Sequence, residues 1–256
     1  AYATEYRQYR WFDRNLTDNF ANRLLKIDVA SKALTDLTPK HDRLFAPSGE
    51  VRCDIAPDGR HLALALNSTP PPYAEQPNTD IVLLPTDGSG TFTNLTTNNP
   101  YGDDYPRFSP DGRSVLYTRV ATANSQGELR RLWQHRLAEK RNVPMAASVD
   151  LSIDNPRFTG DGGSVVFLAE QEGRVPLFRL EPDGSGAPSV LFGEGSSTAL
   201  DVVNQQVVFL NEHTGRPAEL FAMDLKGGPA RQLTRFNEDL FAGLDLGKVE
   251  SHEFVG

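Results

Sequence analysis

The chain has 256 residues, 38% of them hydrophobic, and a formal net charge of −8. An acidic chain with scattered lysine and arginine binds nucleic acid poorly, because phosphate contacts need a concentrated basic surface. No apolar run approaches the roughly 20 residues that span a bilayer, and the first ten residues lack the apolar core of a signal peptide. We therefore expect a soluble protein with neither nucleic acid nor membrane as a partner, and with periplasm and cytoplasm both open as its compartment.

The stretch Glu5–Asp13, EYRQYRWFD, is the first predicted strand. Alternation places Arg7 and Trp11 on one face and Arg10 on the other. Arginine together with aromatic residues is typical of interfaces, so we name Arg7, Arg10 and Trp11 as candidate substrate-contact residues. The alternative is a packing face between sheets, with the arginine stems lying along aromatic rings.

One hairpin pattern occurs three times, in Glu50–Ala65, Tyr105–Thr118 and Asn155–Leu168. Each copy carries Asp-Gly, at 58–59, 111–112 and 161–162, and a degenerate fourth turn is Asn204-Gln205. Asp-Gly between alternating runs is a strong hairpin signal, because glycine tolerates the positive φ that such turns need.

A second hairpin follows each turn, so the repeating unit has four short strands. Three units end in Leu-Thr, and an earlier partial unit consists of RLLKIDVASKA and LTDLT. Four strands in about 50 residues are typical of a β-propeller blade. The strands expected after the four turns are HLALAL, DIVLLP and TFTNLT; SVLYTR, LRRLWQHRL and NVPMAA; SVVFLA, VPLFRL and PSVLFG; and VVFLNE, ELFAMD and ARQLT.

The sequence therefore predicts an all-β fold, a β-propeller with four recognisable four-stranded blades plus part of another, as an incomplete ring. A blade cannot bury both faces alone and has to stack on its neighbours. The strongest helical periodicity lies in Asn237–Leu246 and is short.

Three features that suggest chemistry have plainer interpretations. Cys53 is the only cysteine and stands in a strand pattern, so we expect a buried, inert thiol. Asp103-Asp104 suggests a cation site, but a polar loop at the start of a blade is the better interpretation. His252-Glu253 resembles the start of a zinc-binding His-Glu-x-x-His, but no second histidine follows. We expect neither a metal nor a cofactor.

The sequence of the repeated hairpin resembles the TolB-like, or PD40, repeat x-P-x-F-S-P-D-G. The resemblance is close at Tyr105–Leu116 and weaker at Asn155–Val166. The tail Arg231–Gly256 resembles the junction of prolyl-oligopeptidase-type serine peptidases, the S9 group, near its acylaminoacyl-peptidase and dipeptidyl-peptidase branches. DVASKALTDLTP resembles that family's Asp-x-x-x-Gly-x-x-x-x-Leu-Thr blade end, with Lys32 where glycine is usual.

The resemblance implies a propeller over residues 1–235 that caps an α/β-hydrolase domain. Residues 236–256 would then be a linker and the first strand leading toward that domain, which would lie on the same protein or on a nicked chain. Peptide substrates would enter through the propeller channel or a side opening. The cap would exclude folded proteins, so that the whole protein hydrolyses oligopeptides.

No catalytic residue can be carried over from the resemblance. A serine triad of this kind needs a Gly-x-Ser-x-Gly elbow, and Gly193–Ser197, GEGSS, fails that spacing. We therefore expect the chain alone to be inactive. Two alternatives remain: a non-catalytic TolB-like propeller that binds a protein or peptide, and a hydrolase with its site at the ring centre. A homo-oligomer is also left open.

Overall fold

The computed structural model describes residues 10–11, 14–15, 23–40, 51–68, 78–122 and 127–247, together with positions 250, 252 and 254. Its sheets are antiparallel: two have two strands and four have four strands. The first six strands are β1 (Arg10–Trp11), β2 (Arg14–Asn15), β3 (Leu25–Ile27), β4 (Leu34–Asp36), β5 (Cys53–Ile55) and β6 (His61–Asn67). No helix in the described part of the chain is long and apolar enough to cross a membrane.

The four-stranded sheets are blades, here called A to D in chain order. Blade A is β5, β6, β7 (Thr79–Pro85) and β8 (Thr93–Asn94). Blade B is β9 (Asp103–Phe108), β10 (Ser114–Arg119), β11 (Arg131–Arg136) and β12 (Arg141–Pro144). Blade C is β13 (Ile153–Phe158), β14 (Val165–Ala169), β15 (Leu177–Leu180) and β16 (Ser189–Phe192). Blade D is β17 (Ser196–Val203), β18 (Gln206–His213), β19 (Arg216–Asp224) and β20 (Arg231–Gln232).

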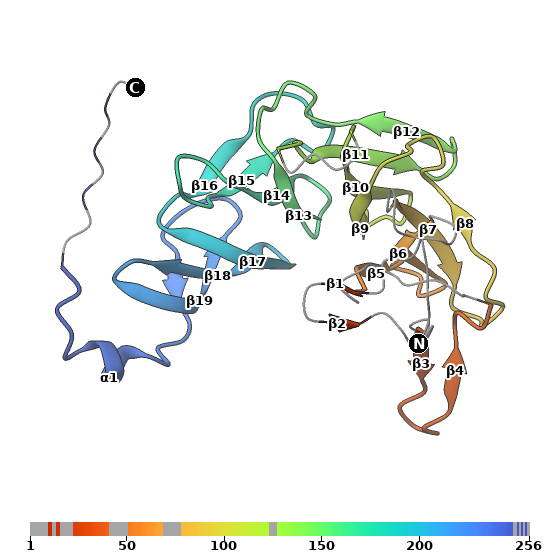
Figure 1. Ribbon diagram of the computed structural model, residues 1–256, viewed down its shortest axis with the longest axis horizontal. Helices are drawn as coiled ribbons and strands as arrows, with labels where there is room; N and C mark the ends of the chain where they lie inside the picture. The colour runs from red at the N-terminus through yellow and green to blue at the C-terminus, as the bar shows by residue number, and fades with distance from the viewer. Residues whose placement is uncertain are drawn as a thin grey trace.

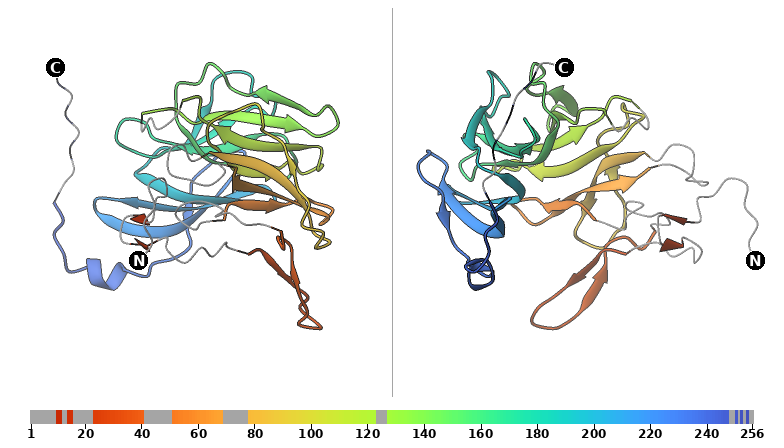
Figure 2. Two further views of the ribbon diagram at one scale, coloured as in Figure 1. Left: turned by 45° about the vertical axis from the view of Figure 1, so that its right-hand side comes forward. Right: turned by 60° about the vertical axis from the view of Figure 1, so that its left-hand side comes forward.

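The blades form an arc in which the first strand of each blade contacts the first strand of the next (Figure 1). The order within each blade is first to fourth strand, so the fourth strand lies outermost. The hairpin of β3 and β4 projects beside blade A (Figure 2), and a short helix, α1 (Glu238–Phe241), follows blade D. The predicted β-propeller with four blades and part of another is confirmed.

The predicted turns adopt the expected conformation. Gly59, Gly112 and Gly162 have φ of 71°, 68° and 71°, and Asn204 takes φ 56° in the two-residue turn between β17 and β18. In blade B the Asp111 carboxylate accepts the backbone N–H of the residue two positions later, at 3.0 Å. Such local bonds stabilise the turn and explain why aspartate precedes the glycine.

The blades stack through alternating apolar faces. Along β10, Val115 and Tyr117 pack against blade A, whereas Leu116 between them packs against blade C. Along β14, Phe167 faces blade B and Leu168 faces blade D. Successive residues are therefore all buried, which is why these strands are more apolar than a one-sided sheet would need.

The Leu-Thr pair at the end of a unit hydrogen-bonds to the third strand of its blade, an arrangement here called the Leu-Thr clasp. This role was not predicted from the sequence. In blade A, the Leu95 N–H donates to the Ile81 carbonyl at 2.8 Å, and the Thr96 hydroxyl accepts the Ile81 N–H at 3.0 Å. The same pair of bonds joins Leu37 and Thr38 to Leu24, and Leu233 and Thr234 to Leu220.

Asp103 and Asp104 are the first residues of β9, so the predicted loop is wrong. The Asp103 carboxylate is fully buried and accepts a hydrogen bond from Arg119 Nε at 2.8 Å. This ion pair explains how an acidic pair can begin a strand, because a buried carboxylate needs a partner. Cys53 is half-buried, and burial raises the pKa of its thiol, which keeps the thiol protonated.

The Leu-Thr clasp predicts a stability effect at Thr96, whose side chain is fully buried. Thr96→Val keeps the shape but leaves the Ile81 N–H without an acceptor, so the free energy of unfolding should fall by about 1–3 kcal/mol. Urea denaturation measures this. Thr96→Ser, which retains the hydroxyl, should lose less, and Thr214→Val on an exposed turn should change nothing. Equal losses for valine and serine would contradict the clasp.

Candidate binding site on the innermost strands

The site residues predicted from the N-terminal stretch are not placed by the structure. Arg7 lies outside the described residues. Arg10 and Trp11 form β1, where they pair with Asn15 and Arg14, but their side chains are outside the described part of the chain. Substrate contact by these three residues therefore stays a prediction.

A row of four charged residues crosses the innermost strands of blades A to D. Asp54, Arg107, Arg157 and Asp201 occupy one register position, opposite Ala63, Leu116, Val166 and Val208 on the second strands. The four side chains line one cavity of about 190 Å³. Going from blade A to blade D, the charges are negative, positive, positive and negative.

Hydrogen bonds join this row between blades A and B, and an ion pair joins it between blades C and D. The Asp54 carboxylate accepts the backbone N–H of Phe108 at 2.8 Å, and Arg107 donates from NH1 to the Cys53 carbonyl at 3.0 Å. On the other side, Arg157 Nε lies 3.6 Å from Asp201 Oδ1. These contacts link blade A to blade B and blade C to blade D.

The two arginines at the centre are incompletely neutralised. Burial, followed by repulsion from Arg107, lowers the pKa of Arg157 to about 10, and Asp201 opposes this shift. Burial also lowers the pKa of Arg107, whose buried Nε has no hydrogen-bond partner among the described residues. Two neighbouring guanidinium groups with spare donors can bind the carboxylate or carbonyl oxygens of a ligand.

A second polar layer lies next to this row. Arg52 forms an ion pair with Asp104 and lies over the Tyr105 ring, 4.0 Å from its centroid. Burial and the neighbouring Asp154 raise the pKa of the Tyr105 hydroxyl, so it stays protonated. Tyr105 and Asn155 have φ of 53° and 48° within irregular stretches of β9 and β13. Such backbone conformations in non-glycine residues are costly and concentrate at functional sites.

Neither polar layer was predicted from the sequence. The pattern that could have revealed the charged row is the Pro-Arg-Phe shared by blades B and C at 106–108 and 156–158. Alignment on the turns brings Arg107 and Arg157 into register. It does not reveal that Asp201 joins them, because the fourth turn is shorter and displaces the register.

No histidine in the described part of the chain hydrogen-bonds to a serine hydroxyl. His135 contacts the Asn142 side chain, His213 accepts the Gly215 N–H, and His252 lies 3.5 Å from Glu250. A serine triad requires a histidine within hydrogen-bond reach of the nucleophile. The described residues therefore offer binding groups but no assembled triad.

Curated relatives match the chain over about three quarters of its length. Dipeptidyl-peptidase 5 of Porphyromonas gingivalis is 24% identical over 190 residues, covering 74% of this chain and 28% of the relative. Dipeptidyl-peptidase 5 of Trichophyton tonsurans is 27% identical over 206 residues, covering 76% of this chain and 28% of the relative. The chain thus spans little more than a quarter of the length of these relatives. No family model matches it.

Solved structures share the fold. TolB from Acinetobacter baumannii superposes with a TM-score of 0.55 at 20% identity, over 78% of this chain and 48% of that one. The β-propeller domain of the Trilobed protease from Pyrococcus furiosus gives 0.58 at 20% identity, over 86% and 60%. The acylaminoacyl peptidase of Pyrococcus horikoshii gives 0.58 at 19% identity, over 86% and 31%.

The fold and the comparisons together define a class: the chain is a β-propeller whose fold is shared by TolB and by the propeller domain of the Trilobed protease. Within that class, its similarity in sequence is to dipeptidyl peptidases.

The charged row predicts opposite stability effects at two neighbouring positions. Arg157→Gln removes a charge that is buried and repelled by Arg107, so the free energy of unfolding should stay unchanged or rise by up to about 1 kcal/mol. Asp201→Asn removes the group that offsets this repulsion, so the free energy of unfolding should fall. The loss should be only about 0.5 kcal/mol, because the Asp201 side chain is largely exposed.

Urea denaturation at pH 7 and low salt measures both effects, with Arg157→Lys as the charge-conserving control. A loss of more than about 1 kcal/mol in Arg157→Gln would show that Arg157 stabilises the fold and is not kept for binding.

Proposed function

We propose that the chain is the substrate-gating propeller part of a serine peptidase that hydrolyses oligopeptides. The observation that carries this proposal is the match to dipeptidyl peptidases across 74–76% of the chain. Catalysis then belongs to an α/β-hydrolase domain on the same protein or on a nicked chain, and the 256 residues alone are inactive. The role of this part is to admit and orient the peptide.

The tail supports a linker to such a domain. Residues 236–256 follow blade D in the chain, and Figure 1 shows α1 directly after that blade. The side chains of Phe236, Leu240 and Phe254 are 85%, 68% and 90% exposed. Apolar side chains gathered on one segment mark a surface that another part covers. The proposed boundary places the propeller in residues 1–235 and the linker in residues 236–256.

The innermost strands supply the proposed contacts with the peptide. A peptide carries carbonyl oxygens along its length and a carboxylate at its end, and Arg107 and Arg157 offer the matching donors. Asp54 and Asp201 flank them and can accept from peptide N–H groups. Arg7, Arg10 and Trp11 remain proposed as further contacts. A rim of stacked blades admits an extended chain but excludes a folded protein.

Labelling with a serine-reactive fluorophosphonate tests whether catalysis belongs to a domain outside these 256 residues. The 256-residue chain should neither react with the probe nor cleave dipeptidyl or longer fluorogenic peptides, because it holds no Gly-x-Ser-x-Gly elbow. The product of the whole reading frame should label on a species larger by roughly a domain of 250 residues, read by denaturing intact mass. Labelling of the short chain would contradict the proposal. A whole product that never labels would favour the non-catalytic TolB-like binding module.

A double variant of the charged row tests the proposed peptide contacts separately from the catalytic reaction. In the whole protein, Arg107→Gln combined with Arg157→Gln should raise KM for an oligopeptide at least about tenfold, since each charged hydrogen bond contributes roughly 1.5–3 kcal/mol and a factor of ten is about 1.4 kcal/mol. The rate of fluorophosphonate labelling should not change, because the small probe does not need the row. Arg113→Gln, on an exposed turn of blade B, is the matched control. A parallel fall in labelling would mean that the variant damages the fold.

A further inference from the structure

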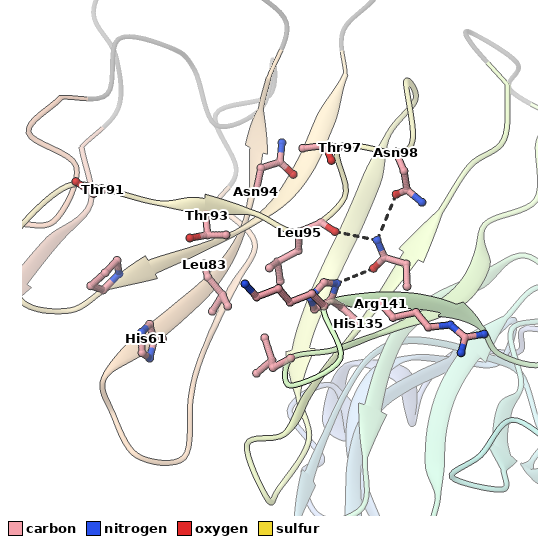
Figure 3. A pocket seen from close by; sticks show the side chains of 14 residues that line it. His61, Leu83, Thr91, Thr93, Asn94, Leu95, Thr97, Asn98, His135 and Arg141 are labelled. Carbon is pink, nitrogen blue, oxygen red and sulfur yellow. Dashed lines mark hydrogen bonds between the residues drawn. The ribbon is translucent and has the colours of Figure 1, made fainter.

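A second polar cavity lies on the outer side of the molecule, between blades A and B. It has a volume of about 670 Å³ and is formed by the outer strands of both blades and the segments that connect them (Figure 3). Pockets that hold small molecules commonly have 300–1,000 Å³. The cavity shares none of its lining residues with the charged row of the innermost strands, so it is a separate feature.

A fixed amide orients the central histidine of this cavity. Asn142 donates from Nδ2 to the Leu95 carbonyl at 2.8 Å and to Asn98 Oδ1 at 3.2 Å. A carbonyl can only accept, so Asn142 Oδ1 has to be the atom that faces His135 Nδ1, at 2.8 Å. His135 Nδ1 therefore carries its hydrogen, and the three bonds are drawn as dashed lines in Figure 3.

This arrangement leaves His135 Nε2 for a ligand. The His135 side chain is 5% exposed and lines the cavity, and Nε2 has no partner among the described residues. The cavity is open to solvent, so a ligand can reach this atom and hydrogen-bond to it.

Asn98 is oriented in the same way from the opposite side. Its Oδ1 accepts from Arg119 NH2 at 3.1 Å as well as from Asn142. Arg119 is itself held by Asp103 and lies over the Trp133 ring, 4.5 Å from its centroid. With its oxygen engaged twice, Asn98 keeps the two hydrogens of its Nδ2 as donors for a ligand.

The charge of the lining determines the class of ligand. His61, His135, Lys140 and Arg141 line the cavity, and the lining contains no aspartate or glutamate. This is a concentration of basic groups in a chain of net charge −8. Hydroxyl groups of Thr91, Thr93 and Thr97 add uncharged donors. Cationic side chains with oriented amide and hydroxyl donors match the oxygens of a carboxylate or phosphate.

We propose that this cavity binds a small organic anion through a carboxylate or phosphate group. The ligand's oxygens interact with Lys140 and with the Nδ2 hydrogens of Asn98, and His135 Nε2 accepts a hydrogen bond from a hydroxyl group of the same ligand. The cavity is open to solvent on the outer side of the blades, so occupancy does not compete with a peptide at the innermost strands. The site is thus an addition to the proposed peptide-gating role and does not depend on it.

Isothermal titration of the 256-residue chain at low salt tests the site, with citrate and glucose 6-phosphate as anionic probes and glucose as the neutral probe. We expect at least one anion to bind at a single site and glucose not to bind. Lys140→Gln should weaken binding about tenfold, since a charged hydrogen bond contributes roughly 1.5–3 kcal/mol. Lys226→Gln is the matched control, because Lys226 is an exposed lysine on the corresponding turn of blade D.

The outcomes separate the possible sources of the anion. Binding of citrate alone assigns a carboxylate ligand, and binding of glucose 6-phosphate alone assigns a phosphate ester. His135→Gln should also weaken binding, with urea denaturation confirming that the variant is folded. If neither anion binds, or if Lys140→Gln and Lys226→Gln weaken binding equally, the proposal is overturned.

Discussion

The structure depends on the fact that each blade is apolar on both faces and can be covered only by its neighbours. Leu116 faces one blade and Tyr117 the other, and both are fully buried. At the end of the arc this covering stops within the described residues. Leu95 is 8% exposed inside the stack, whereas the equivalent Leu233 of blade D is 38% exposed. The far face of blade D and the apolar tail beyond it are therefore surfaces suited to further packing.

The same stacking produces two polar regions with different chemistry. The inner strands meet closely, so Arg107 and Arg157 are brought together although their charges repel. The outer strands of blades A and B leave between them the cavity that contains His135. Holding like charges together costs stability, and proteins retain such arrangements where a ligand uses them. The inner row is the proposed contact for an extended peptide, and the outer cavity is the proposed site for a compact anion.

Much of the fold could be predicted from local patterns. Each Asp-Gly turn and each apolar run following it corresponds to an observed turn or strand, and even the degenerate turn at Asn204 takes the expected conformation. The acidic pair at Asp103 was misassigned to a loop, because its partner Arg119 lies 16 residues away across the sheet. The clasp at Thr96 was missed for the same reason, since its hydroxyl bonds to the third strand.

The sequence by itself determined the repeating unit, the strand order within each blade and the absence of a Gly-x-Ser-x-Gly elbow, because these depend on residues close together in the chain. Only the tertiary structure decided which charged side chains meet. Asp54, Arg107, Arg157 and Asp201 come from four blades, and Asn142 bonds to Leu95 across a blade boundary. Such contacts depend on the register between stacked sheets, which is set by the packing of both faces and by the length of each turn.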